Sequence, residues 1–527
     1  MSNVTLTLHP LLSQGTRLAE EGDYEAAARS LIAHLGQHKD EPQGMAKLGF
    51  VAMRLGALGQ AEHFLRRAIA QGANNFDTRR NLASVLSQQE KPHEAIPLIE
   101  ELVRESGDIG LQSVRAGILD KLGRSEEAVT AQGQLATANP DSPQMWIAYG
   151  HGLRSAGRVD EAIAAYRQAI AAYDEFGDAW WGLASIKRPV LADADVVAMR
   201  CALEIAVDIR NLAPLHFALA RALHDRSDYE AAFRHYDEGN RLRAESLNYD
   251  ARELTDEIAE AERIVTPDFI ARLGNVPLGT SRPIFIVSLP RSGSTLLEQM
   301  LGSHPEIEPV GELAYVPAIL RSVMEMATRR GRVTVLQAVA GLNDSQAAAL
   351  GNDYLQRAAL HRKTDRPFFI DKLPHNWSNI LFIKRIIPQA RFIDIRRPAM
   401  DCCFSNFTQS FTSAHAASFA LRDVGQCYVD NVRLMNHLDR AAPGMVHHIS
   451  YEALVDSPRD ELSRLLDYLG LPWNDTILDF HQLGRVVRTP SSEQVRRPLN
   501  RDGMEVWKPY SRWLDPLREV LSEFAEG

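Results

Sequence analysis

The residues from 282 to 301 combine an anion-binding loop with a positively charged side chain. Ile284 to Val287 are apolar and β-branched or aromatic, as a buried parallel strand requires. Pro290 and Gly293 then interrupt the strand, and from Thr295 onward the apolar residues return at helical spacing. A loop between a strand and a helix directs backbone N–H groups at an anion. The stretch therefore predicts a phosphate site.

The same loop lacks the pattern of a nucleoside triphosphatase. A Walker loop needs Gly-x-x-x-x-Gly-Lys-Ser/Thr, but Ser288 occupies the first glycine position and Ser294 the lysine position. The cation of this loop comes earlier, as Arg291. Because the lysine that bridges β- and γ-phosphates is missing, we do not expect kinase or triphosphatase chemistry. The alternative is an ordinary strand–turn–helix whose serine-rich turn binds nothing.

Three carboxylates follow the helix that this loop opens. Glu306, Glu308 and Glu312 lie in a stretch that Pro305 and Pro309 keep extended or turning. A carboxylate beside a phosphate loop is poorly suited to bind the anion and well suited to take a proton from an incoming hydroxyl. Glu312 is the candidate base, and we expect the other two to be solvated loop acids.

A second buried strand, from Pro367, ends in Lys372. A lysine at the C-terminal end of a strand can reach the crevice in which open parallel sheets bind their ligands. His375 is a second candidate base, although a structural role is the more common one for a single histidine.

A third strand from Arg391 leads into Arg397, Asp401 and Ser405, which are spaced by four. In a helical turn this spacing puts all three side chains on one face. An arginine and a serine hydroxyl on one face suit a second phosphate. The neighbouring pair Cys402–Cys403 has no zinc spacing, so we predict packing residues and no metal.

The stretch from Val446 through Tyr451 predicts a fourth strand and a turn, and we expect His447 and His448 on the surface. The polar, basic stretch 489–500 has the composition of a lid over a nucleotide. It is followed by a closing helix from Asp515.

The chain has 527 residues, of which 45% are hydrophobic and 24% charged, as in ordinary globular proteins. Its net charge of -10 gives no reason to expect nucleic acid as a partner. Four cysteines are too few for a disulfide framework, so we predict a cytoplasmic protein. We expect no signal peptide and no membrane span, because neither pattern occurs in the sequence.

The first half of the chain, from about residue 10 to 245, is helical and repetitive. Gly22 and Gly56 are 34 residues apart, as are Gly123 and Gly157, and each is followed five residues later by alanine. This pattern resembles the tetratricopeptide repeat (TPR) family, with about seven units. The resemblance implies stacked helical hairpins whose concave groove binds a peptide or partner protein. A structural spacer or dimerisation arm is the alternative.

The second half, from about 282 to 518, resembles the sulfotransferases that use 3′-phosphoadenosine 5′-phosphosulfate (PAPS) and release 3′-phosphoadenosine 5′-phosphate (PAP). Residues 290–295, Pro-Arg-Ser-Gly-Ser-Thr, are similar to the loop of that family for the 5′-phosphosulfate. Arg397 with Ser405 is similar to its 3′-phosphate pair. The donor-binding residues that this resemblance implies are Arg291, Ser292, Gly293, Ser294, Thr295, Arg397 and Ser405.

Within the family, the chain is most similar to protein-tyrosine sulfotransferases. They carry arginine at the position of Arg291, a catalytic glutamate at that of Glu312, and at that of Lys372 a lysine that stabilises the sulfuryl oxygens. The segment Ser491-Ser-Glu-Gln-Val-Arg-Arg-Pro-Leu-Asn500 matches one of theirs, including a catalytic serine at Ser491. Further donor contacts implied by the resemblance are Tyr451, Ser492, Gln494, Val495, Arg496 and Arg497.

Two positions differ from the tyrosine enzymes. Gln409 stands where they have a second 3′-phosphate arginine, and Val506 where they have a further lysine, although Lys508 is two residues on. The predicted acceptor is a protein tyrosine hydroxyl. A small-molecule, glycan or lipid acceptor, with the repeats only localising the enzyme, is one alternative. A TPR interaction scaffold with an inactive transferase domain is another.

The sequence thus predicts a multidomain chain. Residues 1–245 form an all-α TPR superhelix, 246–281 a helical connector, and 282–527 an α/β, P-loop-like sulfotransferase domain with a central parallel sheet.

Overall fold

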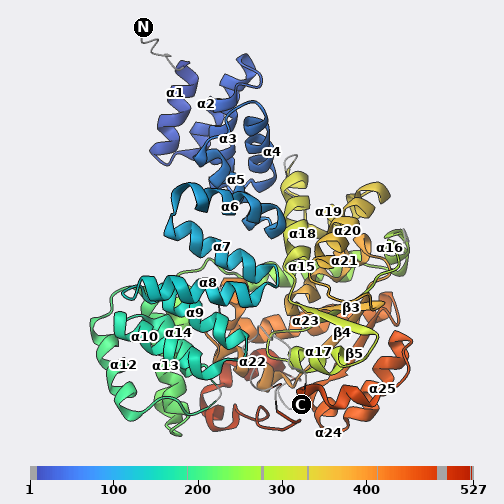
Figure 1. Cartoon of the computed structure of the whole chain (residues 1–527). Helices are drawn as coiled ribbons and strands as arrows, with labels where there is room; N and C mark the ends of the chain where they lie inside the picture. The colour runs from blue at the N-terminus through green and yellow to red at the C-terminus, as the bar shows by residue number, and fades with distance from the viewer. Residues whose placement is uncertain are drawn as a thin grey trace. The chain divides into compact units, whose positions relative to one another are not determined.

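A computed structural model describes residues 9–186, 188–274, 278–328, 331–411, 413–482, 495, 497–522 and 524. The chain divides into two compact units. One comprises Met1–Ala131 with Pro317–Val333, and the other Gln132–Val316 with Thr334–Gly527. The predicted fold class is confirmed, because a helical-repeat half precedes an α/β half with a parallel sheet (Figure 1).

The first unit consists of helical hairpins with the predicted repeat. Gly22 and Gly56 adopt φ of +86° and +76° behind the first helix of their hairpins, where glycine ends a helix at little cost. Ala27 and Ala61, five residues later, are fully buried at the helix crossings. The helices are α1 (Pro10–Glu20), α2 (Tyr24–Gln37), α3 (Pro42–Arg54), α4 (Leu58–Ala70), α5 (Phe76–Gln88), α6 (Pro92–Ser106), α7 (Ile109–Lys121) and the start of α8 (Ser125–Ala138).

Part of a helix from the second half of the sequence belongs to the first unit. Helix α18 (Tyr315–Ala327) carries Glu325, whose carboxylate accepts hydrogen bonds from the backbone N–H groups of Gly59 and Gln60 at 2.9 and 3.3 Å. These amides lie in the first turn of α4, where the helix dipole favours a negative charge. The contact explains why 317–333 groups with the early repeats.

The second unit begins with the later repeats. Gly150 shows how closely their helices cross, because a Cβ there would lie 2.4 Å from Cε1 of Tyr166. The helices are α9 (Pro143–Ser155), α10 (Val159–Ala172), α11 (Gly177–Ala184), α12 (Asp193–Ile205), α13 (Ile209–His224) and α14 (Tyr229–Glu245), followed by α15 (Ala251–Ile264) and α16 (Pro267–Arg272).

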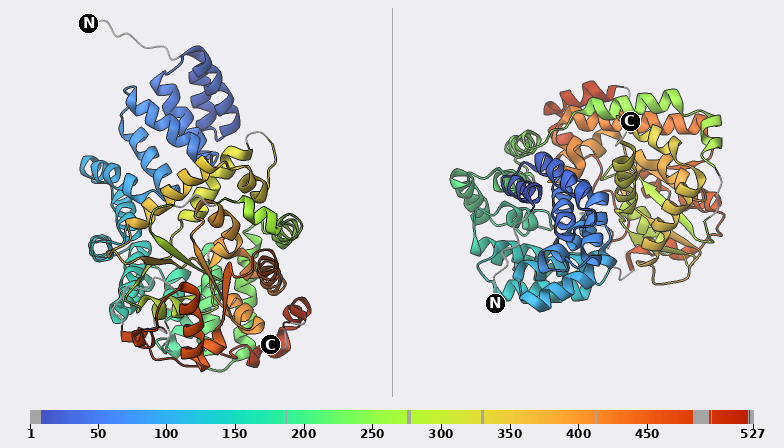
Figure 2. Two further views of the ribbon diagram at one scale, coloured as in Figure 1. Left: turned by 90° about the vertical axis from the view of Figure 1, so that its right-hand side faces the viewer. Right: turned by 90° about the horizontal axis from the view of Figure 1, so that it is seen from above.

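A five-stranded sheet with the order β2-β3-β1-β4-β5 forms the centre of the α/β part, and all of its pairs are parallel (Figures 1 and 2). The strands are β1 (Arg282–Val287), β2 (Ile307–Gly311), β3 (Phe368–Asp371), β4 (Arg391–Arg396) and β5 (Val446–Ser450). Strand β2 lies in the stretch that the sequence predicted only as extended or turning. Pro309 is compatible with it because β2 is an edge strand, which has a free N–H side.

Helices cover both faces of this sheet. Ile284 and Ile286 pack with Leu297 of α17 (Ser294–Gly302) and with α25 (Pro458–Leu469) on one face. On the other face, the ring of Phe285 lies 5.6 Å from that of Tyr354 in α20 (Asp344–Ala359). The remaining α-helices are α19 (Val335–Gly341), α21 (Ile380–Ile386), α22 (Ala399–Phe407), α23 (Leu421–Ala441), α24 (Tyr451–Asp456) and α26 (Asp515–Leu521).

The last repeats and the α/β part share one core. The ring of Phe233 in α14 stacks on those of Phe407 and Trp513 at centroid distances of 6.0 and 5.2 Å. Buried Asn240 donates a hydrogen bond to the carbonyl of Phe407 at 2.8 Å, and Nδ1 of His224 lies 2.7 Å from the hydroxyl of Tyr510. The boundary between the compact units, after Ala131, therefore differs from the predicted domain boundaries at residues 245 and 281. The predicted boundaries were drawn from the end of the repeat pattern, and that division of the sequence stays a prediction.

In the part of the chain that the structure describes, no helix combines the length and the apolar character needed to cross a membrane.

Candidate functional site

Each parallel strand delivers one predicted site residue to the same edge of the sheet. Glu312 follows β2, Lys372 follows β3 and the loop with Arg291 follows β1. Arg397 follows β4 and Tyr451 follows β5. Carboxyl ends of parallel strands meet at one edge, which is where such sheets bind ligands. The strand order places the candidate acid–base groups at one end of this edge and the second arginine at the other.

The loop after β1 has the backbone conformation of an anion cradle. Gly293 adopts φ +96° just before α17, and a Cβ there would lie 2.3 Å from Cδ2 of Tyr451. Glycine is required at this position for both reasons. Ser294 and Thr295 follow as the first, buried residues of α17, so their N–H groups lie at its N-terminus.

Helix α22 holds the loop in place from one side. Asn406 donates a hydrogen bond to the carbonyl of Pro290 at 2.8 Å. The sulfur of Cys402 lies 3.3 Å from the hydroxyl of Ser292. Cys402 is therefore a packing residue, as its sequence context predicted, and burial raises the pKa of its thiol to about 11.

Two arginines meet beside the loop. Nε of Arg291 donates to the hydroxyl of Ser405 at 3.2 Å, and Arg397 donates to the carbonyl of Arg291 at 3.1 Å. Burial, together with the charge of Arg397, lowers the pKa of Arg291 to about 10. Asp401, 3.3 Å from Arg397, neutralises part of this charge, but it also accepts a hydrogen bond from the N–H of Glu505. The arrangement favours an anion, which would relieve the repulsion between the guanidinium groups.

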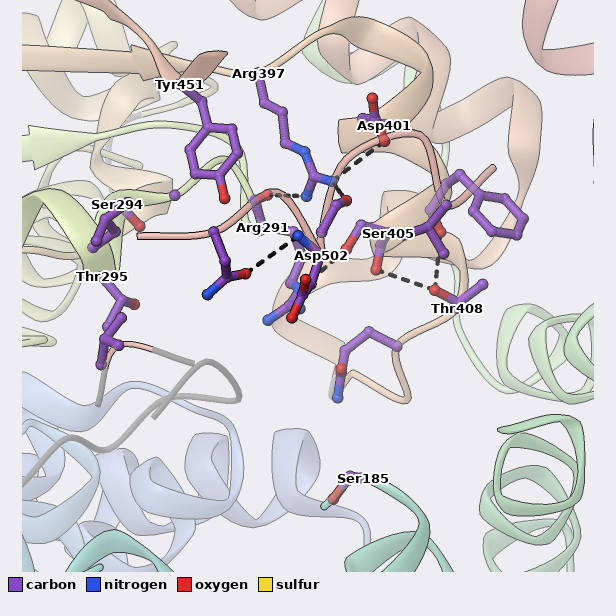
Figure 3. Close-up of a pocket in the computed structure, with 18 of the residues that line it drawn as sticks. Ser185, Arg291, Ser294, Thr295, Arg397, Asp401, Ser405, Thr408, Tyr451 and Asp502 are labelled. Carbon is purple, nitrogen blue, oxygen red and sulfur yellow. Dashed lines mark hydrogen bonds and ion pairs between the residues drawn. The ribbon is translucent and has the colours of Figure 1, made fainter. Parts of the chain in front are cut away.

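A cavity of about 320 Å³ lies against these groups (Figure 3). Its wall includes Gly293 and Thr295 from the loop and its helix, and Arg397 and Ser405 from the region of α22. Tyr451 closes another side, with the guanidinium of Arg397 5.5 Å from the centre of its ring.

The predicted lid falls mostly on residues that the structure does not describe. Ser491, Ser492, Gln494 and Arg496 lie outside the described residues. Val495 and Arg497 are described, and both line the cavity. Arg497 lies 3.1 Å from Asp502 and is largely exposed.

The candidate base and the candidate lysine form an ion pair. Lys372 is completely buried and donates to the carboxylate of Glu312, whose side chain is 40% exposed. A second carboxylate, that of buried Glu298 in α17, lies 4.0 Å from Nζ of Lys372. Sequence reasoning missed Glu298, because within an apolar helix its position gave no sign that it faces β3. The partly exposed Glu312 remains accessible to a substrate hydroxyl.

Asp371, directly before Lys372, is a buried acid behind this pair. It accepts hydrogen bonds from the hydroxyl of Tyr354 at 2.7 Å and from the N–H of Leu313 at 3.3 Å. Burial raises the pKa of Asp371 to about 7 despite these bonds. Its contacts hold the segment that carries Glu312 against β3.

Two predictions about surface residues were wrong. Glu308 is not a solvated acid: it is buried, and it accepts hydrogen bonds from the N–H and hydroxyl of Thr364 at 3.1 and 2.9 Å. His448 is only partly exposed and lies 2.9 Å from Asp394 and 3.0 Å from Asp439. Burial opposes its charge, but these carboxylates raise the pKa of His448 above its usual value. His375, the second candidate base, is exposed, and its ring lies 6.3 Å from that of His415.

Residues of the helical half also line the cavity. Trp181, Ser185 and Arg221 come from α11, the segment after it, and α13. Sequence reasoning did not identify them, because nothing in the repeat pattern marks these positions as functional. Only the packing of α13 and α14 on the α/β part brings them to the site.

Comparison with known proteins confirms both resemblances. Residues 283–475 match the model described as the sulfotransferase family, so the α/β part has the pattern of that class. Residues 12–76 and 143–186 match models of the tetratricopeptide repeat.

Individual relatives cover parts of the chain. It is 33% identical over 323 residues to an uncharacterized protein of Aquifex aeolicus, which covers 60% of this chain and 42% of that one. It is 27% identical over 233 residues to protein-tyrosine sulfotransferase 1 of Danio rerio, with 42% of this chain and 65% of that one covered. It is 26% identical over 242 residues to protein-tyrosine sulfotransferase 2 of Gallus gallus, with 42% of this chain and 62% of that one covered. The chain thus spans less than two thirds of each relative.

Among solved structures, the chain is similar to YrrB, described as a TPR protein with an unusual peptide-binding site. The identity is 18% and the TM-score 0.31, over 32% of this chain and 88% of that one. A crystal structure of the MamA protein is 16% identical with a TM-score of 0.29, over 34% of this chain and 96% of that one.

Proposed function

We propose that the protein is a sulfotransferase that moves the sulfuryl group of PAPS to an acceptor hydroxyl. The observation that carries the proposal is the single sheet edge described above. It presents an anion-binding loop, a second cationic site at Arg397 and Ser405, and the Glu312–Lys372 pair. The match of 283–475 to the sulfotransferase family supports it.

In this proposal the donor lies in the cavity with its two phosphate-bearing ends apart. The N–H groups and hydroxyls of residues 292–295 hold the 5′-phosphosulfate at the N-terminus of α17. Arg397 and Ser405 hold the 3′-phosphate, and Tyr451 packs beside them. Further donor contacts proposed from the sequence are Ser492, Gln494, Val495, Arg496 and Arg497.

Glu312 is the proposed general base. Its carboxylate takes the proton of the acceptor hydroxyl while the hydroxyl oxygen forms a bond to sulfur. The bond between sulfur and the phosphate oxygen breaks, and PAP leaves with the electron pair. Before substrate binds, Lys372 pairs with the carboxylate of Glu312. The protonation of Glu312 then frees Lys372 to face the sulfuryl oxygens.

Fixed positive charges stabilise the transition state in this scheme. Arg291 and Lys372 act on the non-bridging oxygens and the leaving phosphate, and Ser491 is proposed to add a hydrogen bond. Each such preorganised donor contributes roughly 3 kcal/mol to the lowering of the barrier.

The proposed acceptor is a protein tyrosine, because several relatives are named protein-tyrosine sulfotransferases. The TPR half would present the acceptor peptide or dock a partner protein. The neutral side chains at Gln409 and Val506 keep a small-molecule, glycan or lipid acceptor as the second candidate. An inactive scaffold is disfavoured, since the proposed donor-site residues are intact in the sequence. A cytoplasmic location stays a prediction from the cysteine content.

The test is an acceptor screen with radiolabelled PAPS, using tyrosine peptides beside phenols and glycans. Glu312→Ala should reduce transfer roughly 10²- to 10⁴-fold, and Arg291→Ala should also remove most of it. Glu306→Ala, on the same segment but outside the proposed chemistry, should transfer normally. Full activity of Glu312→Ala would exclude this base, and no transfer to any acceptor by the wild-type protein would contradict the proposal itself.

A further inference from the structure

The wall of the cavity that faces the phosphate loop belongs to the helical repeats. Ser185 lies across the cavity from the loop and α22 residues (Figure 3). Arg154 of α9 holds it there by donating to its hydroxyl at 2.6 Å and to its carbonyl at 3.0 Å. Trp181 and Arg221, which come from the same repeats, also line the cavity. A pocket that served the α/β part alone would not need a built wall of this kind.

Arg221 is the charged member of this wall. Its Nε donates to Asp225 one turn later at 2.9 Å, and its side chain is 25% exposed. Within the described residues, no protein acceptor engages the two terminal nitrogens of its guanidinium group. Those nitrogens carry donors in the planar arrangement that suits a phosphate.

The positive charge of Arg221 acts on Arg291, another arginine of the cavity. Burial and the charge of Arg397 lower the pKa of Arg291, and Arg221 adds to this effect. Three guanidinium groups therefore approach the region where Arg291 contacts Ser405. Gln409, in the same region of the cavity, is neutral. The third positive charge comes from α13 in the repeats.

We propose that Arg221 binds a phosphate of the donor nucleotide at the Ser405 end of the cavity, so that the last repeats complete the donor site. This inference rests on the proposed function. If Arg221 has this role, the repeats contribute to donor binding in addition to any docking of a partner protein.

The test measures the affinity of the full-length protein for PAP and for adenosine 5′-phosphate by titration calorimetry. Arg221→Gln should weaken PAP binding about 10- to 100-fold, because a charge-assisted hydrogen bond is lost. The affinity for adenosine 5′-phosphate, which lacks the second phosphate, should fall much less in Arg221→Gln. Arg221→Lys should retain part of the PAP affinity that Arg221→Gln loses. Arg210→Gln is the matched control, since Arg210 lies on the same helix, is exposed and pairs only with Asp208 among the described residues.

The outcomes separate the two proposals. Wild-type protein that does not bind PAP would contradict the proposed function and this inference with it. Wild-type binding that Arg221→Gln leaves unchanged would overturn the inference alone. Equal losses for PAP and adenosine 5′-phosphate would also overturn it, because they would show that Arg221 does not act on the second phosphate.

A second observation, in the first unit, carries an independent proposal. His9, before α1, and His34 and His38 of α2 bring one ligand atom each to within 4.8 Å of one another. His34 is 2% exposed, and within the described residues neither of its ring nitrogens has a hydrogen-bond partner. A buried imidazole without such partners is costly unless something else engages it. The carboxylate of Glu41 lies 3.4 Å from its Nε2.

We propose that His9, His34 and His38 bind a zinc ion. Neutral imidazoles are common zinc ligands, and His34 and His38 have the one-turn spacing of a chelating pair. Nδ1 of His9 accepts a hydrogen bond from the N–H of Leu11 at 3.4 Å, which leaves Nε2 for the metal. Tetrahedral Zn–N bonds of about 2.0–2.1 Å put ligand nitrogens about 3.3 Å apart, so metal binding requires these nitrogens to approach one another by up to about 1.5 Å. Glu41 supplies negative charge beside the site.

The test titrates the metal-free, full-length chain with Zn²⁺, and with Co²⁺ as a spectroscopic probe. We expect one Zn²⁺ per chain, a rise in melting temperature, and the visible absorption of Co²⁺ bound by nitrogen ligands. His38→Ala should weaken Zn²⁺ binding at least about tenfold. His63→Ala, an exposed histidine on α4, should leave it unchanged. Absent binding by the wild type, or equal binding by His38→Ala and His63→Ala, would overturn the proposal.

Discussion

Asp371 illustrates how single residues support the chemistry without taking part in it. It is the last residue of β3, directly before Lys372, and its carboxyl group is held by Tyr354 and by the N–H of Leu313. A buried carboxyl with a raised pKa binds a proton in the folded protein at pH values where the unfolded chain has released it. Its protonation state therefore links the stability of the acid–base pair to pH.

The first prediction concerns this pH dependence. Folding raises the pKa of Asp371 from 3.8 to about 7, so its contribution to stability is fully present below about pH 4 and is lost as pH rises through about 7. The loss amounts to at most about 4 kcal/mol of unfolding free energy. Asp371→Asn keeps an acceptor oxygen and should remove this dependence of the unfolding free energy on pH. Urea titrations at about pH 5 and about pH 8 measure the unfolding free energy of both proteins. An equal change in unfolding free energy between the two pH values for wild type and Asp371→Asn would contradict the assignment.

At the scale of elements, the loop between β1 and α17 depends on a fixed backbone shape. The backbone of Gly293 occupies the left-handed region, and its missing side chain makes room for the ring of Tyr451 at the end of β5. The loop is thus shaped by a strand two positions away in the sheet. Helix α22 holds it from another direction through Asn406.

The second prediction is that Gly293→Ala weakens PAP binding at least about tenfold. The positive φ costs about 1–2 kcal/mol for an L-residue, and the added Cβ must displace Tyr451. Gly279→Ala is the control, because Gly279 has φ +58° but nothing within 4 Å of an added Cβ. Calorimetric titration measures the affinity of both variants for PAP. Equal affinities would contradict this role of Gly293.

Most of the α/β elements could be predicted from sequence because their signals are local. The segments that became β1 and β3 are apolar runs, whereas those that became β4 and β5 mix apolar and polar residues. Arg291, Lys372 and Arg397 could be placed because each follows β1, β3 or β4. Strand β2 was missed, because Pro305 and Pro309 favour a turn and the edge position that tolerates a proline is set by the tertiary fold.

Residues whose role depends on distant contacts could not be found in this way. Glu308 resembles a loop acid until Thr364, which is 56 positions later in the chain, donates to it. His448 is defined by carboxylates on β4 and α23. Arg221 follows the repeat pattern, and its place in the cavity arises only from the packing of α13 against the α/β part.

At the scale of the whole molecule, the later repeats are part of the compact unit that contains the candidate site. Phe233, Phe407 and Trp513 form a stacked aromatic contact across this junction. The chain as a whole has a net charge of -10, so attraction of the proposed anionic donor would come from the local arginines.

The third prediction follows from this shared core. Phe233→Ala should lower the unfolding free energy by about 1–3 kcal/mol, because Phe233 is only partly buried, and should also weaken PAP binding by shifting α13 and α14. Phe64→Ala, in the other compact unit, should reduce stability without changing PAP affinity. Thermal unfolding and calorimetry report the two quantities. Unchanged PAP affinity in Phe233→Ala would mean that the repeats do not shape the donor site.

The most direct test of the account compares the binding of PAP, ADP and ATP to the wild-type protein by calorimetric titration. The proposed donor site has two separate phosphate-binding regions, and the loop after β1 carries no Walker lysine. We therefore predict one site that binds PAP at least about tenfold more tightly than ADP or ATP. Equal or tighter binding of ADP or ATP, or no binding of PAP, would contradict the claim that this sheet edge is a sulfuryl-donor site.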